Sequence, residues 1–454
     1  MAVLQDWNLW QKPPGAGISR PVYVAKLREF LKANQIVTVT GPRRAGKSYV
    51  MRQAARSLVA EGTPPEDILL VNLEDPRLID LDVKTLDRIF ETYREFLAPK
   101  GVPFVFLDEV QEVAGWERWV GAMHELGKAR LVVSGSNARL LSRELGTLLT
   151  GRHLDLRVST LSFAEFLAFN EAAPADRLDV SARAVELKGF LRRYLEEGAF
   201  PQVALAAPKR EILLGYLEDI VQKDVIRRFR IRKAEGLKAL VKHYLSNPAA
   251  HVTFAALGKS FGVSPDSIER FSGHLEQVYA VSLLKRFSYK VREQEKNPRK
   301  AYCVDTGLCN AAGFRFSGNL GRLAENAVFL ELLRRRLADP CFEAFYWKDE
   351  RGREVDFVVK EGLKVSSLVQ VCWDAEEAGT RQRELRGLVK AMVEFEMKEA
   401  LLITEDEEAE ERVEAGVVRL VPLWKWLLSL AQPGHSAGHL LESEGRRNSG
   451  GSVT

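Results

Sequence analysis

Residues 41–48 constrain the fold of this chain more than any other part of its sequence. They read GPRRAGKS and match every fixed position of the phosphate-loop pattern GxxxxGK[ST]. The loop follows an apolar run at residues 36–40 and opens a helical pattern at residues 48–61. A strand, such a loop and then a helix are typical of nucleotide-binding α/β folds, in which free N–H groups at the helix start bind phosphate oxygens.

The first third of the chain continues this alternation of apolar runs and helical patterns. Further near-continuous apolar runs lie at residues 68–72, 104–107 and 131–133, and a helical pattern at residues 116–127 separates the last two. Uninterrupted apolar runs indicate strands that are buried on both faces, so we predict a parallel sheet built from βα units. A shorter alternating run at residues 153–158 is predicted to add a fifth strand.

Each residue type in the loop suits a bound ATP. Gly41 and Gly46 leave room for phosphate oxygens where a Cβ would obstruct them. Lys47 would place a positive charge near the β- and γ-phosphates, and Ser48 would place its hydroxyl on Mg²⁺. The predicted ATP contacts are Gly41, Pro42, Arg43, Arg44, Ala45, Gly46, Lys47 and Ser48.

The apolar run at residues 104–107 ends in two adjacent carboxylates, Asp108 and Glu109. Acids at the carboxyl end of a strand are what a metal site beside a phosphate loop requires. We expect Asp108 to hold Mg²⁺ together with Ser48, directly or through water. Glu109 is expected to polarise the attacking water, so the pair of motifs predicts ATP hydrolysis rather than binding alone.

A cluster of small polar residues at 134–137 follows the next apolar run. If that strand lies between the two that carry the motifs, Ser134 or Ser136 would contact the γ-phosphate or the attacking water. The sequence leaves both open. Downstream, Arg143 and Arg152 are candidates for neutralising the charge of the transition state, including across a subunit boundary.

Motifs along nearly the whole chain resemble those of prokaryotic AAA+ class ATPases that have a winged helix and a C-terminal domain similar to PD-(D/E)xK nucleases. In this resemblance Arg152 occupies a Thr-Gly-Arg motif, which implies an arginine that interacts with the nucleotide. The motifs are Arg20 and residues 40–48, 107–111, 116–117, 134–136, 150–152, 161–166, 302–308 and 352–357.

The resemblance implies an α/β chain with an AAA+ type P-loop parallel sheet, a small helical lid, a winged-helix module and a nuclease-like α/β domain, in that order. We place the ATPase domain at residues 1–160, the lid at 161–233, the winged helix at 234–305 and the PD-(D/E)xK-like domain at 306–432. The polar, Gly- and Ser-rich residues 433–454 are predicted to form a disordered tail.

The middle of the chain has a helix-turn-helix pattern of its own. A short helical pattern breaks at Gly262, and a second helix starts with Ser264 as N-cap and Pro265 at its first position. Residues 281–289 and 301–304 are predicted to pair as a wing.

Basic residues gather near this pattern, at residues 227–233 and 285–300, with Phe287 and Tyr289 interleaved in the second stretch. Such patches favour contact with the DNA backbone, or recognition of DNA shape, over reading of bases. The candidate DNA contacts are Arg227, Arg228, Arg230, Arg232, Lys233, Arg270, Lys285, Arg286 and Lys290.

A nuclease of the PD-(D/E)xK type needs carboxylates for Mg²⁺ and a lysine near the attacking water. Glu325 and Asp356 occupy matching positions, and Glu354 shares a strand face with Asp356. Where the family pattern has Glu-x-Lys, this chain has Gln370 and Cys372, so we interpret the site as degenerate. The lysines that would restore the ammonium, if either reached the site, are Lys348 and Lys364.

The composition of the chain argues against several other classes of protein. A formal net charge of +4 over 454 residues is too small to indicate nucleic acid by itself. The 4 cysteines form no CxxC pair, so we expect buried, reduced thiols rather than disulfides or structural zinc. The chain lacks both a long apolar run and a signal-like N-terminus, which predicts a cytoplasmic protein with no membrane partner.

These features predict an ATPase that couples ATP and Mg²⁺ to the binding or remodelling of DNA, with branched or structured DNA (for example in junction migration) as substrate. An arginine supplied in trans completes such sites, so we expect self-association, for example as a hexameric ring. The alternatives are a nucleotide-controlled switch that binds a protein partner and, less favoured, a Mg²⁺-dependent DNA nuclease. The catalytic candidates are Lys47, Glu109, Ser136 and Arg152.

Overall fold

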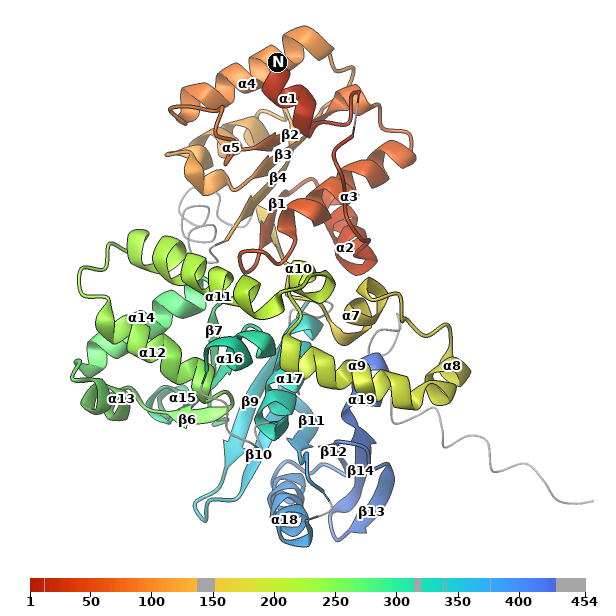
Figure 1. The fold of residues 1–454 in the computed structure, drawn as a ribbon, viewed down its shortest axis with the longest axis vertical. Helices are drawn as coiled ribbons and strands as arrows, with labels where there is room; N and C mark the ends of the chain where they lie inside the picture. Colours follow the sequence, from red (N-terminus) through yellow and green to blue (C-terminus); the bar gives the residue numbers. More distant parts are fainter. Residues whose placement is uncertain are drawn as a thin grey trace, which may run out of the picture. The chain divides into compact units, whose positions relative to one another are not determined.

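The structure is a computed structural model of the chain (Figure 1). It describes residues 1–11, 13–136, 152–313, 320–337, 339, 341–375 and 377–429, so Arg143 and the predicted tail lie outside the described residues. The chain forms two compact units. The first comprises Met1–Thr160, Asp219–Arg230 and Gln277–Ala280, and the second comprises Leu161–Glu218, Ile231–Glu276 and Val281–Thr454. Across the described ranges, no helix is both long and apolar enough to cross a membrane.

The first unit is built on a five-stranded sheet with the order β2-β3-β4-β1-β5, in which every pairing is parallel. The predicted parallel sheet is therefore confirmed. Because β4 lies between β1 and β3, the carboxyl ends of these three strands adjoin at one edge. The strands are β1 (Ile36–Thr40), β2 (Ile68–Asn72), β3 (Phe104–Asp108), β4 (Arg130–Gly135) and β5 (His153–Arg157).

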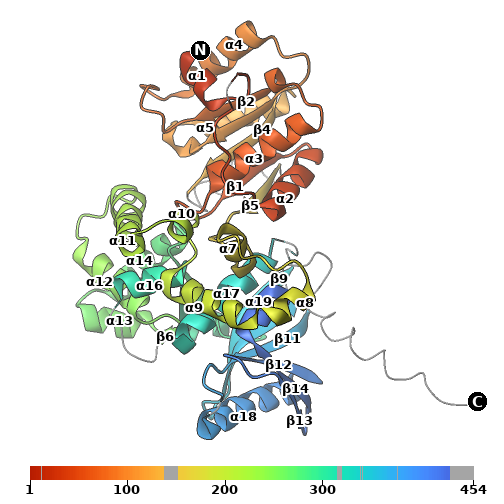
Figure 2. The same cartoon turned by 45° about the vertical axis from the view of Figure 1, so that its right-hand side comes forward.

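Helices cover both faces of this sheet (Figure 2). On one face, Phe90 and Trp119 pack with Leu69, Val105 and Leu131 in a buried core. The helices on that face are α1 (Ala2–Trp7), α4 (Val83–Leu97) and α5 (Trp116–Glu125), and those on the other are α2 (Pro21–Lys32) and α3 (Lys47–Ala60). The short helices of the unit are η1 (Pro65–Asp67), η2 (Val110–Glu112) and the π-helical η3 (Ile220–Arg227).

The second unit begins with helices and continues with a small antiparallel sheet of order β6-β8-β7. The predicted break at Gly262 is present, because α13 ends there with Gly262 at a φ of 64°. The strand predicted at residues 281–289 ends already at Leu284, and a short helix follows it. The helices are α7 (Phe163–Phe169), α8 (Arg177–Ala182), α9 (Ala184–Glu197), α10 (Pro201–Leu205), α11 (Lys209–Asp219), α12 (Glu235–Ser246), α13 (Phe254–Phe261), α14 (Pro265–Gln277) and α15 (Val291–Lys296), and the strands are β6 (Ala250–Val252), β7 (Val281–Leu284) and β8 (Arg299–Cys303).

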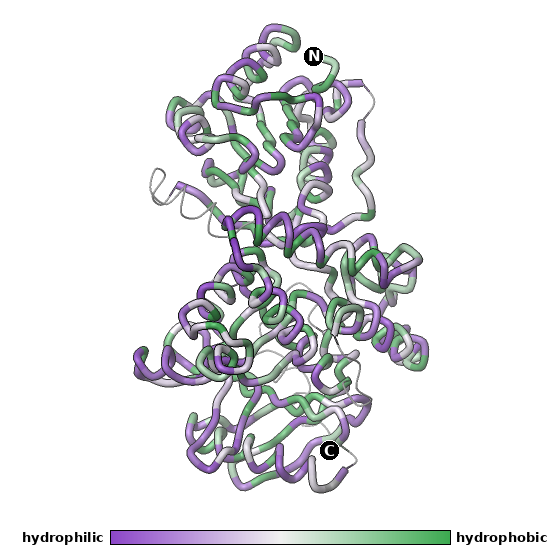
Figure 3. Tube along the Cα trace, turned by 60° about the vertical axis from the view of Figure 1, so that its left-hand side comes forward, coloured by the Kyte–Doolittle hydropathy of each residue, from purple (hydrophilic) through white to green (hydrophobic). Residues whose placement is uncertain are grey.

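The C-terminal part of the second unit contains a mixed six-stranded sheet of order β13-β14-β12-β11-β10-β9. Figure 3 shows hydrophobic and hydrophilic residues interspersed along the trace, as expected for elements that bury one face. Cys303, Cys309 and Cys372 are buried as predicted, but Cys341 is exposed because it lies in the turn before β9. The elements are α16 (Thr306–Ala312), α17 (Leu320–Arg335), β9 (Phe342–Lys348), β10 (Glu354–Glu361), β11 (Lys364–Val371), α18 (Ala378–Glu394), β12 (Glu399–Thr404), β13 (Ala409–Val413), β14 (Gly416–Pro422) and α19 (Leu423–Ser429).

Candidate functional site

The phosphate loop lies between the end of β1 and the start of α3, as its motif predicts. Gly41 has a φ of 139°, and a Cβ built on it would lie 2.0 Å from the carbonyl oxygen of Val158. Gly46, the residue before α3, has a φ of 96°. Both glycines are therefore required by the backbone itself, and the tight turn they allow leaves the first N–H groups of α3 facing the loop.

Lys47 places a buried positive charge in the loop. Its side chain is 3% exposed, and its Nζ donates to the carbonyl oxygens of Gly41 and Pro42, each at 3.2 Å. The same nitrogen lies 3.7 Å from Oε1 of Glu109. A buried ammonium surrounded by the loop is suited to bind a polyphosphate anion.

Asp108 and Ser48 supply the oxygen donors that Mg²⁺ prefers. Asp108 accepts hydrogen bonds from the hydroxyls of Ser134 and Ser48. Burial and the adjacent Glu109 raise the pKa of Asp108, while these two hydrogen bonds oppose the rise. A small cavity of about 20 Å³ beside them is lined mostly by apolar side chains such as Met51 and Phe106, so the fit of an ion rests on the two oxygen donors. The residues therefore fit a magnesium ion.

Glu109 is held rigidly beside this pair. Its backbone is left-handed, with a φ of 54°, and its N–H donates to Ser134 Oγ at 3.0 Å. Gln111 Nε2 donates to its carboxylate at 2.6 Å. Burial alone would raise the pKa of Glu109, but the ammonium of Lys47 and the hydrogen bond from Gln111 lower it. Glu109 is therefore an ionised carboxylate at neutral pH and is able to accept a proton from water.

The two serines at the end of β4 have different environments. Ser134 is occupied, because its hydroxyl contacts Asp108 and the Glu109 N–H. Ser136 is 1% exposed, and its Oγ has no hydrogen-bond partner among the described residues. A buried hydroxyl without a partner is costly, so Ser136 is the one left for a ligand.

A buried acid that the sequence did not single out lies at the same site. Asp224 of η3 is 2% exposed and forms ion pairs with Arg43 at 3.1 Å and with Arg228 at 3.7 Å. Arg228 also acts electrostatically on Glu109. Arg228 therefore lies beside the nucleotide site, and its contact with DNA stays a prediction. No local motif marks Asp224, whose partner Arg43 is far away in sequence.

Two further residues support the phosphate loop from behind. Arg20 is 2% exposed and its guanidinium donates to the carbonyl oxygens of Ala45, at 2.8 Å, and of Ser159, at 3.0 Å. Tyr279 is 6% exposed, and its hydroxyl forms a hydrogen bond with Thr40, the residue before the loop. Arg20 belongs to the motifs found in sequence, whereas no sequence signal marked Tyr279.

Arg152 does not lie at the nucleotide site of its own chain. Its carbonyl oxygen accepts the N–H of Ile36 at 3.1 Å, at the start of β1, whereas the phosphate loop follows the end of β1. The length of this strand, about 16 Å at 3.3 Å per residue, separates the two and exceeds the reach of an arginine. Its exposed guanidinium lies 3.9 Å from Glu125. A role in trans stays a prediction.

The DNA-binding candidates are divided between the two units. Arg227 and Arg230 belong to the first unit together with Arg228, and the remaining candidates belong to the second. Lys285 pairs with Glu295 at 2.5 Å, and Arg286 donates to Asn297 at 3.1 Å. The exposed candidates are Arg227, Arg230, Arg232, Lys233, Arg270 and Lys290, while Arg44 of the phosphate loop is exposed and lies 3.8 Å from Asp219.

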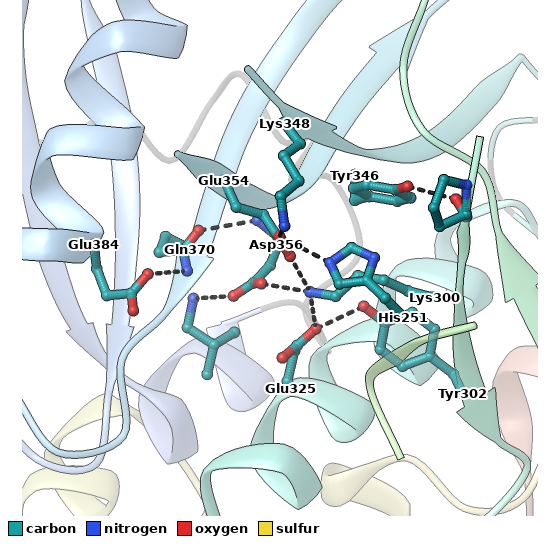
Figure 4. A network of polar contacts seen from close by, with 12 residues as sticks. His251, Lys300, Tyr302, Glu325, Tyr346, Lys348, Glu354, Asp356, Gln370 and Glu384 are labelled. Atoms are coloured by element: carbon teal, nitrogen blue, oxygen red, sulfur yellow. Dashed lines mark hydrogen bonds and ion pairs between the residues drawn. The ribbon is translucent and has the colours of Figure 1, made fainter. Parts of the chain in front are cut away.

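The nuclease-like positions partly come together in the second unit (Figure 4). Glu325, Glu354 and Asp356 converge, and Gln370 contacts Asp356. Cys372 does not join them, because it packs in a hydrophobic core. Of the two lysines considered from the sequence, Lys348 reaches Glu354 at 3.0 Å, whereas Lys364 is exposed at the start of β11. Lys300, which sequence reasoning missed, contacts all three carboxylates.

The charges in this cluster shift one another's pKa values. Burial and the neighbouring Asp356 raise the pKa of Glu325 to about 7. Burial would raise the pKa of Glu354 as well, but hydrogen bonds from His251 and Lys300 hold it well below its usual range. Burial alone would lower the pKa of Lys300, and the attraction of Asp356 and Glu325 raises it instead, so the amine is an ammonium at neutral pH.

Comparison of the sequence with known proteins identifies the relatives of this chain. Models of three domains match the chain: an AAA domain at residues 33–167, a domain of unknown function (DUF8612) at 189–319 and a second one (DUF4143) at 320–426. An uncharacterized protein of Methanocaldococcus jannaschii is 31% identical over 410 residues, which cover 87% of this chain and 89% of that protein. An uncharacterized protein of Haemophilus influenzae is 29% identical over 370 residues, 80% of this chain and 88% of that protein.

Solved structures resemble the chain more distantly. A Walker-type ATPase of Pyrococcus abyssi has a TM-score of 0.41 and 14% identity, over 65% of this chain and 95% of that one. Nucleotide-bound DnaA of Aquifex aeolicus has a TM-score of 0.24 and 12% identity, over 56% of this chain and 86% of that one. The first unit is assigned instead by its AAA domain match and its phosphate loop on a parallel sheet. The chain thus belongs to the same family as the Methanocaldococcus jannaschii protein, and its first unit is a P-loop ATPase domain.

Proposed function

We propose that this chain hydrolyses ATP and uses the cycle to bind or remodel branched or structured DNA. The observation that carries the hydrolysis step is the ionised, buried Glu109 beside Lys47 and the unpartnered hydroxyl of Ser136. Lys47 would bind the phosphates, and Ser136 would donate to the γ-phosphate or orient the attacking water. Glu109 would accept a proton from that water.

Ser48 and Asp108 are the residues that would hold Mg²⁺. When bound, the ion would supply positive charge to the phosphate oxygens and so lower the cost of charge building up during transfer. Ser134 would keep Asp108 and Glu109 in register, since its hydroxyl contacts both residues. Arg228 acts electrostatically on Glu109 and would add a further positive charge from within the chain.

The middle of the second unit is proposed to be a winged helix that contacts DNA. The order of its elements supports this, because α12, β6, α13, α14 and β7 follow one another, and β8 pairs with β7 after the short helix α15. The second helix, α14, contains Asp266 and Glu269 beside Arg270. This mixed charge favours contact with the backbone or recognition of shape over reading of bases.

A cleft in the second unit is the surface we assign to unpaired DNA. It has a volume of about 680 Å³, and five cationic and three acidic side chains line it together with Phe287, Tyr289 and Trp347. Tyr289 is 81% exposed and its ring meets Phe287 edge-on at 5.1 Å. Among the described residues, neither Arg351 nor Lys390 of this cleft has an ion-pair partner.

An exposed aromatic ring beside unpaired cations suits a strand whose bases are not in a duplex. The ring stacks on a base of any identity, and the cations contact phosphates. Forked and four-way DNA expose unpaired bases where their arms meet, whereas a blunt duplex offers few. The cleft therefore supports branched DNA as the preferred ligand.

Salt-titrated binding of labelled duplex, forked and four-way DNA, with and without ATP, tests this proposal. Tyr289→Ala should weaken binding of forked DNA by roughly 5- to 100-fold, as expected for the loss of one stacked base. Leu363→Ala is the matched control, because Leu363 is 95% exposed in the turn after β10 and does not line the cleft. Absence of DNA binding at low salt, or an equal effect of both substitutions, would contradict the DNA half of the proposal.

Self-association belongs to the same proposal. Arg152 is exposed at the amino-terminal end of β5, opposite to the end that carries the phosphate loop. An arginine in that position is available to the nucleotide site of a neighbouring copy, as happens when subunits stack head to tail in a ring such as a hexamer. Sedimentation with and without ATP measures the assembly directly.

The second candidate function is a nucleotide-controlled switch that binds a protein partner. Arg43 of the phosphate loop is tied to Asp224, and residues 219–230 are covalently continuous with the second unit on both sides. Nucleotide binding would compete for Arg43 and so act on this segment. The switch predicts slow hydrolysis and ATP-dependent partner binding that salt does not abolish, and DNA-stimulated turnover would exclude it.

A further inference from the structure

A buried cluster of charges joins the small sheet of the second unit to the six-stranded sheet (Figure 4). Glu325 belongs to α17, Glu354 and Asp356 belong to β10, and Lys300 belongs to β8 of the small sheet. The side chain of Lys300 is only 4% exposed. A charge buried to this degree needs to be both paired and hydrogen-bonded.

The ammonium of Lys300 is saturated by the three carboxylates. Its nitrogen lies 2.7 Å from Glu325, 2.7 Å from Asp356 and 3.0 Å from Glu354. A lysine ammonium has three N–H donors. Its contacts with Glu325 and Asp356 are hydrogen bonds and its contact with Glu354 is an ion pair, and Figure 4 shows the three carboxylates around it.

The cluster is also closed on the side of β11. Asp356 accepts the Val371 N–H at 3.0 Å through its other oxygen. Gln370 takes the place of a carboxylate, and its Oε1 accepts the Asp356 N–H at 2.9 Å. Its amide nitrogen donates to Glu384 at 2.7 Å. Gln370 is thus committed to protein partners through both ends of its amide.

The outer side of the cluster is occupied in the same way. The Tyr302 hydroxyl donates to Glu325 at 2.7 Å. Glu354 contacts Lys348 at 3.0 Å and His251 at 2.8 Å. These contacts neutralise the carboxylates further and orient each of them toward Lys300.

We propose that Lys300 is the resident cation of this cluster and stands where a divalent metal ion would otherwise bind. Mg²⁺ needs oxygen ligands at about 2.1 Å, and the space between these carboxylates holds an ammonium at 2.7 to 3.0 Å instead. An entering ion would have to displace an ammonium that is paired with all three carboxylates and leave it unpaired in a buried place. The cluster therefore clamps β8 to α17 and β10 and does not serve as a metal-dependent catalytic centre.

The presence of Lys300 explains why three carboxylates can converge here, which the replacement of family residues by Gln370 and Cys372 does not explain. Gln370 and Cys372 account for a missing ligand and a missing lysine, yet three carboxylates still converge. Three converging carboxylates without a cation would repel one another strongly. Lys300 removes that repulsion and fixes the position of a strand that is distant in sequence from β10.

Manganese binding to the nucleotide-free full-length chain, followed by electron paramagnetic resonance, tests the proposal. The native chain should show no manganese site that depends on Asp356. Lys300→Ala removes the ammonium and leaves room for an ion, so manganese should bind at least about tenfold more tightly, and adding Asp356→Asn should abolish this gain. Lys348→Ala is the control, because it removes the same charge but only one contact with Glu354.

The outcomes separate cleanly. A manganese site in the native chain that Asp356→Asn removes would overturn the proposal, and this comparison needs no change at Lys300, so it holds even if Lys300→Ala fails to fold. Equal gains in Lys300→Ala and Lys348→Ala would overturn it as well. Circular dichroism of each full-length variant serves as the folding check, because the cluster lies in the second unit and the ATP site in the first. A native chain that fails to bind ATP would count against the proposed ATPase function, not against the clamp.

Discussion

Replacing Glu109 with glutamine separates ATP binding from hydrolysis. The substitution keeps the size of the side chain and its hydrogen bond with Gln111, but it removes the proton acceptor and the charge 3.7 Å from Lys47. The adjacent Asp108 also loses the neighbour that raises its pKa. We therefore expect a chain that binds ATP with Mg²⁺ as well as the native one and hydrolyses it poorly.

The size of the effect follows from the role and the geometry of Glu109. A positioned general base contributes about 10²- to 10⁴-fold in rate, which is roughly 3 to 5 kcal/mol of activation free energy. Two charges about 4 Å apart attract by at most about 4 kcal/mol at an effective dielectric constant of 20. Glu109→Gln forfeits this attraction, so the nucleotide-free variant should melt at a lower temperature than the native protein. ATP should raise both melting temperatures by a similar amount, since the two proteins bind it equally well.

Single-turnover hydrolysis measures the chemical step, and calorimetric titration with ATP and Mg²⁺ measures binding. Glu112→Gln is the control, because Glu112 lies in the adjoining η2 and is exposed, and it does not contact Lys47. Native-like hydrolysis by Glu109→Gln would refute the role given to this carboxylate. Loss of ATP binding in Glu109→Gln would refute the separation of the two steps.

Three further results are expected. Arg152→Ala and Lys47→Ala should each be inactive alone, and mixing the two proteins should restore part of the ATP turnover if Arg152 acts in trans, whereas a mixture as inactive as its parts would exclude that role. Gly41→Ala should unfold at a lower denaturant concentration than Gly62→Ala. Both glycines have a positive φ, but only at Gly41 would the added Cβ collide with the backbone. Burial raises the pKa of Glu325 from 4.5 to about 7, so this group contributes stability that is fully present below pH 4.5 and is lost as the pH rises through 7. Between pH 4.5 and 8 the free energy of unfolding of the native chain should therefore fall by up to about 3 kcal/mol relative to that of Glu325→Gln, measured by urea unfolding.

Sequence reasoning recovered the parts of the nucleotide site that lie in contiguous motifs. The phosphate loop has a fixed spacing, and Asp108 and Glu109 follow a strand whose burial is visible as an apolar run. The edge at which these strands end was predictable as well, because parallel strands share their carboxyl edge. The choice between Ser134 and Ser136 was not predictable, because it depends on which of the two hydroxyls donates to Asp108.

Residues brought in from distant segments could not be predicted in this way. Asp224 reaches Arg43 across 181 positions, and Lys300 reaches Asp356 across 56. Neither lies in a motif, and a single charged residue reads in sequence as a solvated surface group. The ion pair of Arg228 with Asp224 was not predictable for the same reason, because a run of arginines looks alike in sequence whether or not one of them faces a carboxylate.

The first unit is assembled from three separate stretches of chain, so it cannot be isolated as one continuous fragment. Cutting after residue 160 removes Asp224, which anchors Arg43, and Tyr279, which contacts Thr40. An isolated amino-terminal fragment should therefore be unstable and a poor nucleotide binder, however intact its motifs look. A fragment meant to bind nucleotide would therefore have to keep residues 219–230 and 277–280, which lie within the stretch of chain that otherwise forms the second unit.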